Sequence, residues 1–91
     1  MNRFILYINT RRPEAIGHAT ELMEWLEEMG NSCYFAPESA VAIGRPELAI
    51  KESDITNDFQ LAIALGGDGS VLRTVTAVSD HQIPVLGINF G

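Results

Sequence analysis

The stretch IALGGDGSVLRTV, from Ile63 to Val75, joins a strand pattern to a helix pattern through a glycine-rich turn. The apolar run FQLAIAL, Phe59 to Leu65, leads into the turn and predicts a buried strand. After the turn, apolar residues recur at helical spacing, namely Val71, Leu72, Val75 and Val78. A strand that passes at once into a helix is the repeating unit of an α/β sheet, so this stretch decides the fold class.

An earlier strand–helix–strand unit is predicted near the N-terminus. The aromatic and β-branched runs Arg3–Asn9 and Ser32–Pro37 predict two strands. Pro13 suits the first position of the helix between them, and Gly30 suits the position just after its end. The apolar stripe of that helix is predicted to be Ala15, Ala19, Leu22, Leu26 and Met29. A unit of this length places its two strands parallel in one sheet.

The region between the second and third strands is harder to interpret. Glu38 to Asp58 shows no sustained period, so it is expected to be mainly a connection, with Pro46 as the candidate start of a short helix. Pro84–Phe90 predicts a fourth strand. The order strand, helix, strand, connection, strand, helix, strand predicts an open parallel α/β sheet of about four strands with helices on both faces.

Composition excludes several function classes. The chain has 91 residues, a net charge of −6, and six Lys and Arg residues that form no cluster beyond Arg11 and Arg12. A nucleic-acid surface would need a basic stripe, so none is expected. The single cysteine, Cys33, allows no internal disulfide and suits a reduced, cytoplasmic protein. No apolar run is long enough for a membrane span or a signal peptide, so no membrane partner is expected.

The glycine turn predicts a site for an anion. Gly66, Gly67 and Gly69 let the backbone approach a ligand closely, and the helix that follows directs its N–H groups toward the turn. The pattern is neither a P-loop, which needs a lysine, nor the GxGxxG fingerprint. Spacing alone leaves two interpretations open: a phosphate site, or a tight turn in which Asp68 or Ser70 caps the helix.

The carboxylate of Asp68 helps to choose between them, because it would repel phosphate unless it had another role. It can cap the helix, carry Mg²⁺, or accept the proton of a hydroxyl that attacks a phosphoryl group. The third role accounts for the charge best. A kinase-like site holds phosphates with backbone N–H groups and places one carboxylate at the nucleophile.

These residues resemble a known family. GGDGS at Gly66–Ser70, followed by VLR, and PVLGINFG at Pro84–Gly91 closely resemble the N-terminal domain of NAD kinases, and the whole chain fits that domain in length and element order. The GGDG element also occurs in 6-phosphofructokinases and in diacylglycerol and sphingosine kinases, which are the alternative groups. The second element matches the start of the NAD kinase pattern GINxGxLGFL and favours that family.

The resemblance implies a two-domain enzyme. Residues 1–91 would be its Rossmann-like N-terminal nucleotide-binding domain, with the GGDG loop at 66–69, and a β-rich C-terminal domain is absent from this chain. Such enzymes transfer a phosphoryl group from ATP or polyphosphate, with a divalent metal such as Mg²⁺, to the 2′-hydroxyl of the adenosine ribose of NAD. They are usually homo-oligomers. The chain alone is expected to be inactive, and a non-catalytic nucleotide-binding fragment is the alternative.

The resemblance also implies roles for individual residues. Asp68 would be the proton acceptor, and no residue is assigned as a metal ligand. The nucleotide-binding residues would be Gly66, Gly67, Gly69, Arg73 and Asn89. Gly91 extends the match to the second motif.

Overall fold

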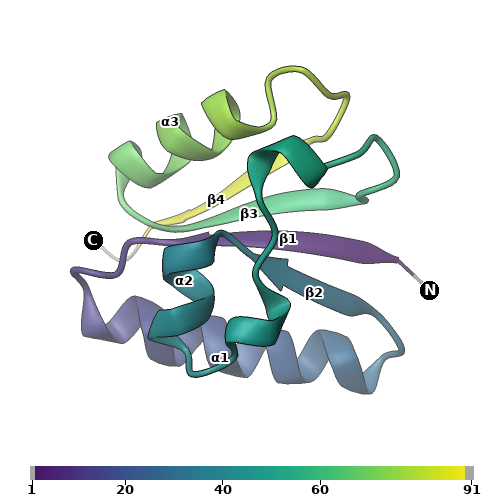
Figure 1. Ribbon diagram of the computed structural model, residues 1–91. Coiled ribbons are helices and arrows are strands. Elements are labelled where there is room, and N and C mark those ends of the chain that lie inside the picture. The colour runs from purple at the N-terminus through teal and green to yellow at the C-terminus, as the bar shows by residue number, and fades with distance from the viewer. Residues whose placement is uncertain (1, 90–91) are drawn as a thin grey trace.

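The protein is described here by a computed structural model that covers residues 2–89, with Asp68 described by its backbone alone. Four parallel strands form one sheet in the order β2-β1-β3-β4 (Figure 1). Their bounds are Arg3–Ile8 for β1, Ser32–Phe35 for β2, Leu61–Gly66 for β3 and Val85–Asn89 for β4. The predicted open parallel α/β sheet is therefore confirmed.

Helices cover both faces of the sheet, as predicted. Helix α1, Pro13–Glu28, lies on one face, and α3, Asp68–Ala77, lies on the opposite face (Figure 1). Each helix packs on its own cluster of buried residues. The cluster under α1 includes Ala15 and Ile63, and the cluster under α3 includes Val78 and Ala62. Among residues 2–89, no helix has the length and apolar character that crossing a membrane requires.

The segment predicted to be mainly a connection contains three short helical turns. They are the α-helix α2, Pro37–Ala42, and the 3₁₀ turns η1, Pro46–Leu48, and η2, Glu52–Asp54. Pro37 and Pro46 each stand at the start of a helical turn. The first N–H of a helix has no partner within it, so a proline loses no hydrogen bond there, and the expectation for Pro46 is correct. Helices of six and three residues are too short to show a helical period, which is why the pattern did not predict α2.

The stripe predicted for α1 is partly wrong. Its buried residues are Ala15, Ala19, Met23 and Leu26. Leu22 is only partly buried, and Met29 is 61% exposed because the helix ends at Glu28 and Met29 lies beyond its last turn.

The stripe predicted for α3 also needs correction. Leu72 is 69% exposed and Val75 45%, whereas Thr74 is fully buried. Burial of Thr74 costs little because its hydroxyl donates a hydrogen bond of 2.7 Å to the Ser70 carbonyl. A Cβ at Gly87 of β4 would lie 2.6 Å from Cγ2 of Val71, so the absence of a side chain there lets α3 pack close to the sheet.

Candidate functional site

The central strands β1 and β3 lie side by side, and the chain leaves them toward opposite faces of the sheet. After β1 it enters α1 on one face, and after β3 it enters α3 on the other (Figure 1). In open α/β sheets this arrangement opens a crevice beyond the carboxyl ends of the two strands, where ligands bind. The glycine turn that follows Leu65 lies at this place, as predicted.

Gly66 lies where the residue after β1, the end of β3 and the first turn of α3 meet. Its φ of +149° lies in a region that residues with a side chain rarely adopt. A Cβ on Gly66 would lie 2.6 Å from the Cβ of Asn9, which follows β1, and 2.6 Å from the Oγ of Ser70, in the first turn of α3. Gly66 also pairs in register with Asn89 of β4. Both backbone and packing therefore require glycine here.

Helix α3 begins immediately after this contact. Its N-cap is Gly67, whose backbone is extended and which has no side chain, so the N-cap position itself is not Asp68 or Ser70, as one interpretation of the sequence had it. The N–H groups of a first helical turn have no partner within the helix and attract anions. A Cβ on Gly67 or Gly69 would meet no described atom within 4 Å, which leaves the turn open. The Asp68 side chain lies outside the described part of the structure.

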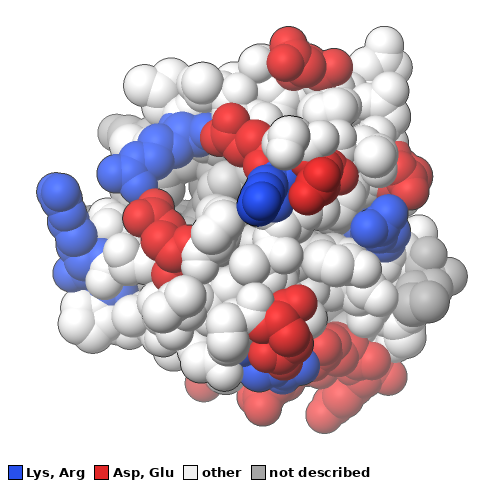
Figure 2. Space-filling view, in the orientation of Figure 1, with Lys and Arg blue, Asp and Glu red and all other residues white. Residues whose placement is uncertain are grey.

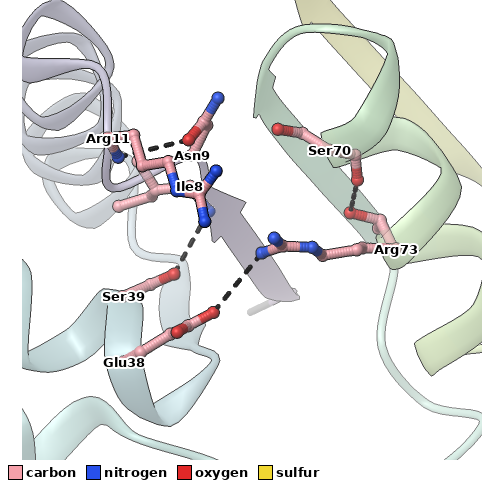
Figure 3. A network of polar contacts seen from close by, with 8 residues as sticks. Ile8, Asn9, Arg11, Glu38, Ser39, Ser70 and Arg73 are labelled. Carbon is pink, nitrogen blue, oxygen red and sulfur yellow. Dashed lines mark hydrogen bonds and ion pairs between the residues drawn. The ribbon is translucent and has the colours of Figure 1, made fainter.

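The turn after β1 is held by its own backbone and by Asn9. The Asn9 N–H donates to the Leu65 carbonyl at 2.9 Å, and the Asn9 side-chain oxygen accepts the N–H of Arg11 at 3.2 Å (Figure 3). This is the local turn that an asparagine commonly forms. Arg12 pairs with Glu14 at 2.9 Å, within the start of α1.

Arg73 reaches from α3 across the strand ends to α2. Its Nη1 lies 3.6 Å from Oε1 of Glu38 (Figure 3). The next residue of α2, Ser39, is 1% exposed, and its hydroxyl accepts the N–H of Ile8 at 3.2 Å. Glu38 and Ser39 were not predicted as site residues, because their segment shows no helical or strand period. Pro37, which opens α2, was the one available signal.

A small cavity of about 20 Å³, the strand-end hollow, lies beside the glycine turn. It is lined by Tyr7, Ile8, Glu38, Ser39, Ser70 and Arg73. It adjoins a larger cavity of about 660 Å³, the groove, with which it shares Tyr7, Glu38 and Arg73. The volume of the groove is in the range of small-molecule sites.

The groove has largely apolar walls with a few polar groups. The residues that line it and not the hollow are Ala36, Pro37, Ile50, Glu52, Leu72, Thr76 and Ala77. Burial, with a smaller effect from the charge of Glu52, raises the pKa of Tyr7 to about 12. The Tyr7 hydroxyl, which any tyrosine keeps protonated at neutral pH, can serve there as a hydrogen-bond donor.

Charge is mixed around this site. Figure 2 shows acidic and basic side chains interspersed on this face, with no large basic area. Among the described side chains, no three His, Cys, Asp or Glu residues gather closely enough to hold a metal ion. The described residues therefore do not form a metal site of their own.

Comparison with known proteins gives consistent matches. Residues 4–91 match the family described as ATP-NAD kinase N-terminal domain. The chain is 37% identical over 91 residues to an NAD kinase of Symbiobacterium thermophilum and 35% identical over 91 residues to one of Geotalea daltonii. It is 35% identical over 89 residues to an NAD kinase of Chlorobaculum tepidum. These matches cover 98–100% of this chain but only 30–32% of the relatives, so the chain spans about a third of their length.

Proposed function

The chain belongs to the NAD kinase family, and on this premise we propose that it is the N-terminal part of an enzyme that phosphorylates NAD to NADP. The phosphoryl group passes from ATP to the 2′-hydroxyl of the adenosine ribose. The observation that best supports this proposal is the glycine turn at the junction of β1, β3 and α3, where Gly66 tolerates no side chain. A turn of this kind brings backbone N–H groups close to phosphate.

The geometry of the turn supports the roles that we propose for its residues. Gly66 and Gly67 let phosphate oxygens approach the backbone, and Gly69 leaves room for NAD against the first turn of α3. Asn89, whose backbone pairs with Gly66, brings the carboxyl end of β4 to the same edge. Arg73 supplies a cation from the second turn of α3.

Asp68 is the proposed base. As the nucleophilic oxygen of the ribose 2′-hydroxyl bonds to the terminal phosphorus of ATP, the bond to the ADP oxygen breaks and the hydroxyl proton passes to the Asp68 carboxylate. A divalent ion bound by phosphate oxygens would neutralise charge on the transferred group.

The groove is proposed to hold the base and ribose of a nucleotide, with ATP or polyphosphate as the phosphoryl donor. Its apolar walls and the Tyr7 hydroxyl offer contacts to such groups. Arg73 lines both the groove and the strand-end hollow, so one nucleotide can reach from the groove to the glycine turn past this side chain.

We further propose that the whole protein is a cytoplasmic homo-oligomer that binds neither nucleic acid nor membrane. The net charge of −6 and the absence of a clustered basic stripe in the sequence support the first exclusion. The single cysteine supports a reducing compartment.

The experiment that tests the function uses the full-length protein with NAD and Mg-ATP, and detects NADP with an NADP-specific dehydrogenase. NADP should form, and 2′-deoxy-NAD should give no phosphorylated product. Binding of NAD without NADP formation would contradict the proposal and favour the alternative, a non-catalytic nucleotide-binding protein. Residues 1–91 alone should show no turnover, because the relatives are about three times longer.

A further inference from the structure

We propose that Glu38 is a positioning residue that holds the Arg73 guanidinium across the strand-end hollow in the ligand-free protein and competes for it with the incoming phosphate. The inference rests on the proposed function, in which Arg73 contacts the nucleotide. It adds a residue of α2 to a site that otherwise comes from the strand ends and α3 (Figure 3).

The position of Glu38 is set by its neighbour in α2. The Ser39 side chain is 1% exposed and its hydroxyl accepts the Ile8 N–H, which ties α2 to the carboxyl end of β1. The Ala40 N–H donates to the Ala36 carbonyl at 2.9 Å, which fixes the turn on either side of Glu38. A carboxylate is therefore held beside a crevice that is proposed to receive phosphate.

The ion pair lies between the two cavities. Glu38 and Arg73 line both the strand-end hollow and the groove, one from α2 and the other from α3. A ligand that extends from one cavity into the other has to pass this pair. Separation of the two side chains would therefore accompany binding.

Arg73 can readily exchange Glu38 for a phosphate. The two charged atoms are 3.6 Å apart, and the side chains of Arg73 and Glu38 are 69% and 67% exposed. Exposed pairs of this kind contribute little, whereas a phosphate binds a guanidinium through two parallel charge-assisted hydrogen bonds. Phosphate should therefore displace Glu38, and the need to break the pair should make the apparent affinity of the wild-type protein for phosphate only a few-fold weaker than it would be without Glu38.

The test measures the affinity of the full-length protein for ATP, and separately for inorganic tripolyphosphate, by titration calorimetry. Glu38→Gln keeps the shape of the side chain and removes its charge, so both ligands should bind about two- to five-fold more tightly. The gain should shrink at high salt. Glu47→Gln is the matched control, because Glu47 is also exposed and pairs with an arginine, Arg45, at 2.6 Å. It should leave both affinities unchanged.

A second comparison separates competition for Arg73 from simple repulsion of phosphate. Arg73→Ala should weaken binding of both ligands, and Glu38→Gln should then give no gain in the Arg73→Ala background. A gain that persists there would overturn the proposal, because Glu38 would act directly on the ligand. If Arg73→Ala weakens binding but Glu38→Gln alone gives no gain, the proposal fails while the nucleotide role of Arg73 stands. If Arg73→Ala has no effect, that nucleotide role fails and the proposal with it, whereas NADP formation still tests the enzyme's function independently.

Discussion

Replacing Gly66 by alanine should destabilise the protein by about 2–6 kcal/mol, the sum of two independent costs. The first is backbone strain, since a φ of +149° costs a residue with a side chain about 1–3 kcal/mol. The second is overlap, since the new Cβ would lie 2.6 Å from both the Asn9 Cβ and the Ser70 Oγ. Forcing an extra carbon into such a contact costs about 1–3 kcal/mol.

The assay is urea unfolding followed by far-ultraviolet circular dichroism. Because total stabilities are about 5–15 kcal/mol, Gly66→Ala should lower the midpoint strongly or leave the protein largely unfolded. Gly67→Ala is the matched control: its backbone is extended and its Cβ would meet no described atom within 4 Å. It should unfold near the wild-type midpoint but bind nucleotide more weakly, since the added methyl group enters the proposed phosphate site.

The comparison can refute the packing argument at the centre of the site. If Gly66→Ala unfolds at the same urea concentration as the wild type, the close approach of Asn9, Gly66 and Ser70 is wrong. If Gly66→Ala and Gly67→Ala destabilise equally, the loss reflects glycine content and not the geometry of this turn.

Three further predictions concern the rest of the domain. Gly17→Ala, in the interior of α1 with no described atom near the new Cβ, should stabilise by about 0.5–1 kcal/mol in the same urea assay; a destabilised variant would contradict the helix environment. Cys33 is buried, and burial, with a smaller effect from Glu27, raises its pKa to about 11, so a thiol reagent at pH 8 should react only on unfolding, and rapid reaction in native buffer would contradict this. Tyr7 ionises at about 12 in the folded protein against 10 in an unfolded chain, so its stabilising effect should be complete below pH 10 and lost as the pH rises from 10 to 12; Tyr7→Phe should lose less stability over that range, and equal losses would refute the assignment.

The order of strands and main helices could be predicted because each apolar run is separated from the next by glycine, proline or a polar turn. Helical periodicity predicted only part of the side of α3 that faces the sheet. Val78 is buried and Val71 lies against Gly87, but Leu72 and Val75 are exposed. The less apolar Thr74 is buried instead, and its hydroxyl is satisfied by a hydrogen bond to the Ser70 carbonyl. Gly87 of β4 then sets how closely the helix lies. Tertiary contacts, not helical periodicity, decide this orientation.

The candidate site was predictable where the chemistry lies in one contiguous motif. Gly66, Gly67 and Arg73 all belong to the stretch around the glycine turn. Glu38 and Ser39 come from a six-residue helix that shows no period, and only the three-dimensional structure brings them to the end of β1. The catalytic role of Asp68 is a proposal that neither the sequence nor the structure tests, and turnover measurements test it.

The turnover of Asp68→Asn in the full-length protein tests whether Asp68 is the base, with NAD affinity and magnesium dependence measured on the same variant. The amide keeps the size of the side chain but cannot accept the proton of the ribose hydroxyl, so NADP formation should fall by about 10²–10⁴-fold. NAD affinity should stay constant or rise, because a negative charge beside the phosphates is removed. Partial rescue by added magnesium would assign Asp68 to the metal instead. Near-normal turnover would contradict the account and leave the glycine turn as a binding element without a base.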